Sequence, residues 1–355
     1  MKKIKVGMVI PTWGQQCGVA DYTKQLIEHT QDQSITVQVY SDVNPDLPSV
    51  MRKDGIDIAH FQYEHSIYDF TALYQILTAL QQQSIPIVTT LHSWSSELAC
   101  HNLLISGRSC IVIVHSEQMK QLCLADGFRQ EQLAVMPIGC QSFPLQPADK
   151  TRKLFTINGH PSIGFFGFPF PHKGIANLMD ALIELKAYFP DLKGYFFSHY
   201  PNYLDHEHPY YSFYQKLQTR FEKNDYLIWI KEYLPEPAIV NLLSTMDMNV
   251  LPYVEHNQKG ISAAVRLMLA ARRPVITTNY LYFSDLKNEV FKMPNAEADT
   301  IASSICRVFL HSSLQQELIA KGDLFLKDNS WEKVGRAYRE FYKQNLSKKA
   351  GEERR

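Results

Sequence analysis

The sequence predicts an α/β fold of two Rossmann-like domains in series, each built on a parallel sheet. Three observations support this prediction. Short β-rich runs that are apolar on both faces alternate with helical patterns along the chain. A stretch from Pro137 to Pro161, with four prolines and no sustained periodicity, interrupts the alternation before it begins again. At 355 residues the chain is also long for one core, so two domains of about 150 to 200 residues are expected.

The first predicted domain covers residues 1–150. Strands are expected at residues 4–10, 35–40, 56–62, 86–92, 110–116 and 133–137. Helices are expected at residues 21–30, 70–83 and 116–127, where apolar side chains recur at helical spacing. Helices between strands that are buried on both faces imply parallel pairing.

The second predicted domain covers residues 151–327. Its strands are expected at residues 162–168, 193–199, 226–230, 246–251 and 274–278, and its helices at residues 174–189, 211–223, 237–246 and 262–271. A long helical ending begins at Thr300, and residues 328–355 are expected to hold a last helix and a polar tail from Leu346 onward. Two domains of this kind place a ligand cleft at the carboxyl ends of their strands.

Composition excludes several classes of protein. The formal net charge is zero, so nothing suggests a nucleic-acid partner. We find no run of about 18 uncharged apolar residues, so no membrane-spanning helix is expected. The apolar start at residues 4–10 reads as a buried strand rather than a signal peptide, because Lys5 and Pro11 interrupt it. A cytoplasmic location is predicted, and contact with the inner face of the membrane stays open.

No metal site is expected. Six cysteines have no CxxC spacing, which favours reduced thiols over a zinc site or a redox pair. The run Asp205–Tyr211 contains side chains that bind metals, but its pattern fits an exposed loop.

Three loops that follow predicted strands are candidates for the binding site. In Pro11–Leu26, Gly18 lets the backbone approach a ligand and opens a helix, although the dinucleotide-binding pattern GxGxxG is absent. His92 directly follows an apolar strand, where it would donate a hydrogen bond or carry charge, or serve as a structural histidine. Lys173 and Gly174 precede a helix, where a lysine indicates a bound anion unless it is a solvated surface residue.

The stretch Leu251–Thr278 reads as strand end, glycine loop, helix and next strand. Gly260 gives the turn, Ser262 is the expected N-cap, and a helix is predicted from Ala263 to Ala271. A helix N-terminus suits a phosphate, because its backbone N–H groups lack intrahelical partners. The alternative is an ordinary connection between two strands. A further candidate, Glu64, ends another strand, where it would orient or deprotonate an acceptor hydroxyl.

Together these segments resemble the GT-B fold glycosyltransferases, and among them the large retaining family called GT4. The likeness covers nearly the whole chain and is carried by CGVADYT, HFQYEHSIY, TTLHS, VIVHSEQMK, FGFPFPHKGI, EYLPEPAIVNLLSTMDMNVLPY, GISAAVRLMLAARRPVITT and NSWEKVGRAYREFY. It implies a GT-B architecture, two Rossmann-like domains facing a central cleft, with a last helix that returns to the first domain.

The resemblance implies transfer of a sugar from a nucleotide-sugar, UDP- or GDP-linked, to a glycan, lipid-linked or protein acceptor. The anomeric configuration would be retained, and neither a metal nor a further cofactor would be required. It assigns catalytic roles to His92 and Lys173, and Glu255 is a third catalytic candidate because it could substitute for a family glutamate that is missing here. It assigns donor binding to Gly18, Phe168, Lys173, Gly260, Ile261, Ser262 and Arg266, and the acceptor side to Cys17, Tyr22 and Glu64.

Two departures from the family pattern keep a second function open. Many members carry two glutamates with seven residues between them, and the corresponding positions here are Lys259 and Leu267. Glu255 lies nearby and could replace the first glutamate, and Arg266 could supply positive charge from the helix. Phe168 stands where an arginine is usual. The alternative is a catalytically silent GT-B subunit that partners an active transferase. A sugar-nucleotide epimerase is a third option. Such an enzyme normally has additional acid and base carboxylates in the cleft, and the sequence shows no clear set of them.

Overall fold

The structure is a computed structural model that describes residues 3–202 and 204–352. The chain divides into two compact units. Unit 1 comprises residues up to Gly139, the segment Asn257–Ile261 and the residues from Asn329 onward, and unit 2 comprises Cys140–His256 and Ser262–Asp328. The expected boundary at residue 150 therefore differs from the structural one, because residues 140–150 belong with unit 2.

Unit 1 holds a six-stranded parallel sheet in the order β2-β1-β3-β4-β5-β6, as far as the described residues show. Val6 at the centre lies opposite Val37 on one side and Ile58 on the other. The strands are β1 (Ile4–Val9), β2 (Ile35–Tyr40), β3 (Ile58–Tyr63), β4 (Ile87–Leu91), β5 (Ile111–Val114) and β6 (Leu133–Val135). The helices are α1 (Gly18–Thr30), α2 (Leu47–Lys53), α3 (Phe70–Gln82), α4 (Ala99–Arg108), α5 (Glu117–Ala125) and α13 (Trp331–Glu352).

Unit 2 holds a second six-stranded parallel sheet within the described part of the chain, in the order β12-β11-β10-β7-β8-β9. Its strands are β7 (Ser162–Phe166), β8 (Lys193–Phe197), β9 (Leu227–Ile230), β10 (Met248–Leu251), β11 (Val275–Thr278) and β12 (Phe291–Met293). Its helices are α6 (Ala148–Leu154), α7 (Ile175–Lys186), α8 (Pro209–Glu222), α9 (Glu236–Leu243), α10 (Ala264–Ala270), α11 (Ala298–Leu310) and α12 (Ser312–Asp328).

Local sequence explains where several helices begin. The Asp69 carboxylate accepts a hydrogen bond from the Ala72 N–H at the start of α3, and Ser116 caps α5 through the Met119 N–H. The buried strands carry mostly apolar side chains, as parallel strands covered on both faces require, with polar exceptions such as His60 and Gln62 in β3. Each sheet therefore places the loops that follow its strands at one edge, where the candidate site residues lie.

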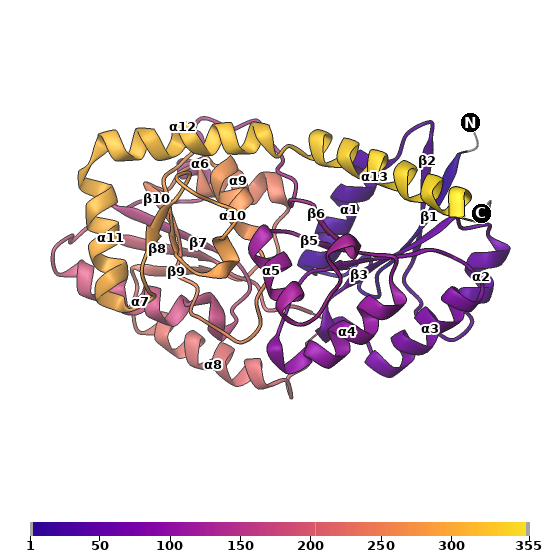
Figure 1. Cartoon of the computed structure of the whole chain (residues 1–355). Coiled ribbons are helices and arrows are strands. Elements are labelled where there is room, and N and C mark those ends of the chain that lie inside the picture. The colour runs from indigo at the N-terminus through magenta and orange to yellow at the C-terminus, as the bar shows by residue number, and fades with distance from the viewer. Residues whose placement is uncertain (1–2, 203, 353–355) are drawn as a thin grey trace. The chain divides into compact units, whose positions relative to one another are not determined.

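The last helix returns to unit 1. In Figure 1 the yellow helix α13 runs beside the indigo helix α1, and Tyr338 of α13 is buried with its hydroxyl 2.9 Å from that of Tyr22 in α1. The polar tail expected from Leu346 is helical as far as Glu352, and residues 353–355 lie outside the described part. Among the described residues, no helix is both long and apolar enough to cross a membrane.

Four elements escaped the sequence prediction: helices α2, α4 and α6 and strand β12. Helix α6 lies within the stretch expected to be a linker, where only Thr151 of its seven residues is buried. A helix with so little apolar surface to bury leaves almost no periodic signal in the sequence. Strand β12 is three residues long, which is too short for an alternating pattern to stand out.

Candidate functional site

His92 follows β4 directly, as predicted, and lies half-buried at the edge of the unit 1 sheet. Its Nε2 lies 2.9 Å from Oε1 of Gln62, a side chain that is fully buried in β3. The ring packs edge-on against Tyr22 and lies 5.2 Å from the ring of His115. These contacts hold the plane of the imidazole.

His60 and His92 are neutral because burial penalises their charged forms. Burial, with a smaller contribution from His115, lowers the pKa of His60 to about 3. Burial and the neighbouring His115 and His60 hold the pKa of His92 well below its usual value. His92 is therefore an uncharged hydrogen-bonding group at neutral pH, and the expectation that it would carry charge is not supported by its surroundings.

A buried polar network behind His92 was missed by the sequence reasoning. His60 Nδ1 lies 2.6 Å from the Tyr342 hydroxyl, and its Nε2 lies 2.8 Å from Thr90 Oγ1. Gln62 links this network to His92. The available signal was the pair of polar residues His60 and Gln62, two apart in a strand that is otherwise apolar and wholly buried.

Glu64 ends β3 and forms a cluster with His65 and Ser93. Its carboxylate accepts from the Ser93 hydroxyl, from His65 Nδ1 at 2.9 Å, from the Ser66 N–H at 3.1 Å and from Gln258 Nε2 at 3.2 Å. Burial disfavours the ionised form, but the hydrogen bonds and the charge of His65 outweigh it and lower the pKa of Glu64. A carboxylate with this many donors is a weak base, so its acceptor-side role stays a prediction.

The segment Asn257–Ile261 belongs to unit 1. Lys259 and Trp94 exchange two backbone hydrogen bonds of 2.6 Å in an isolated antiparallel bridge. A Cβ atom on Gly260 would lie 2.7 Å from the His92 carbonyl oxygen, so only glycine fits this close approach. The predicted donor residue Gly260 is thus next to His92, and Ile261 beside it is 9% exposed.

The start of α1 carries three predicted site residues. Gly18 opens the helix as expected, and no atom lies within 4 Å of where its Cβ would be. Cys17 is the N-cap residue but makes no side-chain cap, and it is 3% exposed. The Tyr22 hydroxyl bonds that of Tyr338, so it serves the packing of α13 on α1.

Lys173 lies in unit 2, at the end of a 3-10 turn and two residues before α7. Its ammonium group sits 4.1 Å from the centre of the Tyr253 ring, on the ring face. Within the described part of the chain it has no carboxylate partner. Gly174 follows with a φ of +69°, and its Cβ position lies 1.8 Å from the Pro252 carbonyl oxygen. The loop after β10 and the start of α7 are therefore pressed together beneath the lysine.

Aromatic rings surround this turn. Phe168 stacks on Phe170 at 5.6 Å, and Phe170 packs against Tyr210 at 4.9 Å. The His172 ring stacks on Tyr282 at 6.2 Å, and burial, with the nearby Lys173 charge, lowers the pKa of His172 to about 2. Phe168, which stands where an arginine was expected, is thus part of an aromatic surface beside Lys173.

The stretch 251–278 differs from its prediction at the helix start. Helix α10 begins at Ala264, and Ser262 does not cap it: the Ser262 hydroxyl lies 3.1 Å from that of Tyr253. Arg266 is 3% exposed, with its guanidinium bound to the Asp285 carboxylate and the Ser262 carbonyl. In this structure the Arg266 charge is thus compensated inside unit 2, while Glu255 is exposed. The donor-binding roles of these residues stay predictions.

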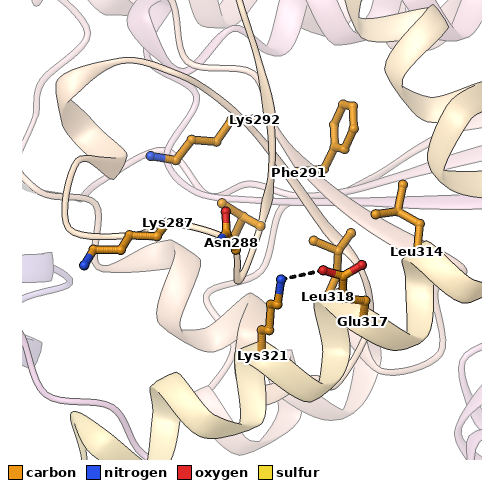
Figure 2. A pocket seen from close by; sticks show the side chains of 9 residues that line it. Lys287, Asn288, Phe291, Lys292, Leu314, Glu317, Leu318 and Lys321 are labelled. Atoms are coloured by element: carbon orange, nitrogen blue, oxygen red, sulfur yellow. Dashed lines mark hydrogen bonds and ion pairs between the residues drawn. The ribbon is translucent and has the colours of Figure 1, made fainter.

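A hollow of about 280 Å³ lies elsewhere on unit 2, between the β12 region and α12. Figure 2 shows Lys321 turned toward Glu317, while the ammonium groups of Lys287 and Lys292 point away from them. Lys292 is bound to the carbonyl oxygens of Phe283 and Leu286. The polar groups do not converge, so this hollow lacks the character of a binding site.

Two further expectations concern metals and thiols. In the part of the chain that the structure describes, no three histidine, cysteine or acidic side chains gather as a metal would require. All six cysteines are unpaired.

Comparison with known proteins identifies the fold. No protein-family model and no curated protein matches the chain. Among solved structures, HepE of Anabaena in complex with UDP is similar over 97% of this chain and 100% of its own, with 13% identity and a TM-score of 0.78. A glycosyltransferase from Rickettsia africae matches over 98% and 99%, with 16% identity and a TM-score of 0.74.

A third solved structure agrees with these two. Sucrose-phosphate synthase from Thermosynechococcus elongatus matches over 97% of this chain and 100% of its own, with 14% identity and a TM-score of 0.74. At such identities the likeness speaks for the fold. The chain has the GT-B architecture of two α/β domains, each with a six-stranded parallel sheet.

Proposed function

We propose that this protein is a retaining glycosyltransferase of the GT4 type, which moves a sugar from a nucleoside-diphosphate donor to an acceptor hydroxyl. Solved structures of the same fold hold UDP with glucose, UDP-glucose and UDP-2-fluoro-glucose, which favours a UDP-linked donor. The reaction would occur in the cytoplasm, without a metal or a further cofactor, in the synthesis of a surface glycan, glycolipid or glycoprotein.

The observation that carries the proposal is the Lys173 ammonium group. It lies over the Tyr253 ring with no carboxylate to neutralise it in the described residues, at the end of a turn fixed by Gly174. A half-buried cation held on an aromatic face beside a helix start is well placed to bind an anion. A diphosphate is the anion that the fold neighbours' nucleotide ligands would present.

The chemistry favours such a cation. When the bond between the anomeric carbon and the diphosphate oxygen breaks, the leaving nucleoside diphosphate gains negative charge. A new bond forms between the same carbon and the acceptor oxygen, and the acceptor proton passes to a diphosphate oxygen. Lys173 would stabilise the developing charge more strongly than the ground state, which is the condition for catalysis.

The remaining residues take roles that follow from their positions. We assign His92 to a sugar hydroxyl, and Gly18, Gly260 and Ile261 to backbone approach toward the donor. Phe168 and its stacked partner would offer an apolar face to it. Glu255, exposed after β10, would replace a missing acidic residue.

One observation favours the alternative of a catalytically silent subunit. Leu267 packs against the core of unit 2, and the Lys259 backbone is engaged with Trp94, so neither position offers an acidic group. Such a subunit would keep the fold and use it to bind a partner transferase.

Calorimetry with UDP, GDP and ADP tests the proposal. We expect one of them to bind, and Lys173→Ala to weaken it by about tenfold or more, because a charge-assisted contact to phosphate is lost. Lys231→Ala is the matched control, since Lys231 also lies over an aromatic ring of unit 2, Trp229, at 4.8 Å. Absence of binding by all three nucleotides would favour the silent subunit, and equal affinity of wild type and Lys173→Ala would remove Lys173 from the site.

A further inference from the structure

The carboxamide of Gln62 lies between His60 and His92 and is fully buried. Its Oε1 lies 2.9 Å from His92 Nε2, while its Nε2 lies 3.0 Å from Met8 Sδ and 3.3 Å from His60 Nε2. Each polar atom of this side chain therefore has a partner inside unit 1.

Chemistry decides which way the amide faces. A thioether sulfur carries no hydrogen, so the atom of Gln62 that faces Met8 Sδ has to be the NH2 group. The carbonyl oxygen then faces His92, and an oxygen can only accept. His92 Nε2 consequently carries the proton, and Nδ1 keeps its lone pair.

The lone pair on Nδ1 is available. No partner of His92 Nδ1 exists in the described part of the chain, and the residue is half-buried rather than enclosed. The titratable groups that face the ring are Tyr22 from α1, His60 from β3 and His115 after β5. None of the three supplies a negative charge at neutral pH, so nothing near the ring favours imidazolium.

We propose that Gln62 is a positioning residue that locks His92 in the Nε2–H tautomer, so that His92 meets its ligand as a hydrogen-bond acceptor through Nδ1. The ligand group that fits is a hydroxyl, which can donate, rather than a phosphate or carboxylate, which cannot. Identifying that hydroxyl as part of a sugar rests on the proposed function.

The support behind Gln62 is rigid. His60 Nδ1 lies 2.6 Å from the Tyr342 hydroxyl of α13. His60 Nε2, the atom that faces Gln62, also lies 2.8 Å from Thr90 Oγ1. Both His60 and Tyr342 are fully buried. Small displacements of a reacting geometry cost large factors in rate, so a buried chain of hydrogen bonds that fixes His92 has a function beyond packing.

Nitrogen NMR of protein labelled with ¹⁵N-histidine tests the tautomer directly. Assigned by loss of its signals in His92→Asn, the His92 imidazole should show a protonated Nε2 and a bare Nδ1. Gln62→Met keeps the approximate length and volume of the side chain but removes the amide oxygen that accepts from His92. We therefore expect the His92 Nδ1–H form to appear. A protonated Nδ1 in the wild type, or an unchanged tautomer in Gln62→Met, would overturn the proposal.

Gln132→Met is the matched control. Gln132 is also a buried glutamine of unit 1, but it bonds Ser106 and Ser109 rather than His92. Its loss should lower stability and leave the His92 signals unchanged. A similar tautomer change in this control would show a general effect of losing a buried amide and count against Gln62.

Gln62→Glu supplies a second readout. A carboxylate beside Nε2–H favours the charged imidazole, so the pKa of His92 should be higher in this variant than in the wild type, and its nitrogen signals should titrate at a higher pH. In turnover assays, Gln62→Met should reduce kcat by about ten- to a hundredfold with little change in nucleotide affinity. If the NMR result holds but no sugar is transferred by the wild type, the proposed function fails and the role of Gln62 stands.

Discussion

Gly174 is the residue whose identity is set most strictly by its surroundings. Its φ of +69° lies in the left-handed region, and a Cβ atom would lie 1.8 Å from the Pro252 carbonyl oxygen. No other amino acid fits both constraints, because one is a matter of backbone conformation and the other of space. The close packing of this turn against Pro252 fixes the position of the Lys173 backbone, from which its side chain extends.

Gly174→Ala should lower the free energy of unfolding by about 2–4 kcal/mol, the sum of left-handed strain and a backbone clash. Gly55→Ala is the control, because Gly55 has the same φ of +69° and no atom within 4 Å of the added methyl group. It should lose only about 1–2 kcal/mol. Urea unfolding of both variants measures the difference, and equal losses would show that the contact with Pro252 is not what makes glycine necessary.

At the scale of elements, helix α13 depends on two close approaches. A Cβ on Gly335 would lie 2.2 Å from the His29 carbonyl oxygen of α1, and one on Gly139 would lie 2.2 Å from the Trp331 ring. Arg339 adds a bond to the same His29 carbonyl. Gly335 lets the backbone of α13 approach that of α1. Tyr338 and Tyr342 of α13 are fully buried.

Replacing Gly335 by alanine should therefore change the free energy of unfolding in the direction opposite to the usual one. A glycine inside a helix normally gains about 0.5–1 kcal/mol on change to alanine. We expect Gly335→Ala to lose about 1–3 kcal/mol instead, because the methyl group pushes α13 from α1. Gly107→Ala in α4, where nothing lies within 4 Å, should be neutral or stabilising in the same urea titration. A stabilised Gly335→Ala protein would contradict the close packing.

At the scale of the whole molecule, three histidines, one buried and two half-buried, make the protein sensitive to acid. Burial lowers the pKa of His60 to about 3 and that of His172 to about 2, and holds that of His92 well below normal. An unfolded chain binds these protons near pH 6.5. Between pH 6.5 and the folded values the unfolded state holds more protons, so stability falls as the pH falls.

Each such histidine should remove about 1.4 kcal/mol of stability per pH unit below about pH 6. His172→Phe keeps an aromatic ring in an aromatic cluster and removes one titration, and the His172 Nδ1 atom has no partner to lose. The variant should therefore lose less stability than the wild type between pH 6 and pH 5, by about 1 kcal/mol. Urea midpoints at both pH values measure this. A His172→Phe protein with the wild-type slope would refute the linkage.

Periodicity was informative wherever an element buries a whole face. Strand β2 was predicted at its observed limits, and α3 to within one residue, because apolar side chains recur there at the period of the element. Helix α6, with one buried residue, gives no such pattern. The N-cap predicted at Ser262 is wrong for a related reason: the Ser262 hydroxyl bonds Tyr253, a partner that is adjacent only in the folded unit.

The candidate site shows the same division. His92 and Lys173 could be placed at strand and helix ends from the sequence, because those ends follow from local pattern. That Gln62 bonds His92 depends on the register between β3 and β4, which sets Gln62 opposite Thr90. That Arg266 is compensated depends on Asp285, nineteen residues away along the chain.

The sequence by itself determined two parallel α/β sheets, the order of most elements and the loops at their carboxyl ends, because periodicity and turn residues act over a few neighbours. Only the tertiary structure decided which polar side chains are bound by others. The Lys173 ammonium lies over the Tyr253 ring, and the Glu64 carboxylate accepts hydrogen bonds from four donors. Hydrogen bonds and burial join residues distant in sequence, and they set the protonation and direction of each group.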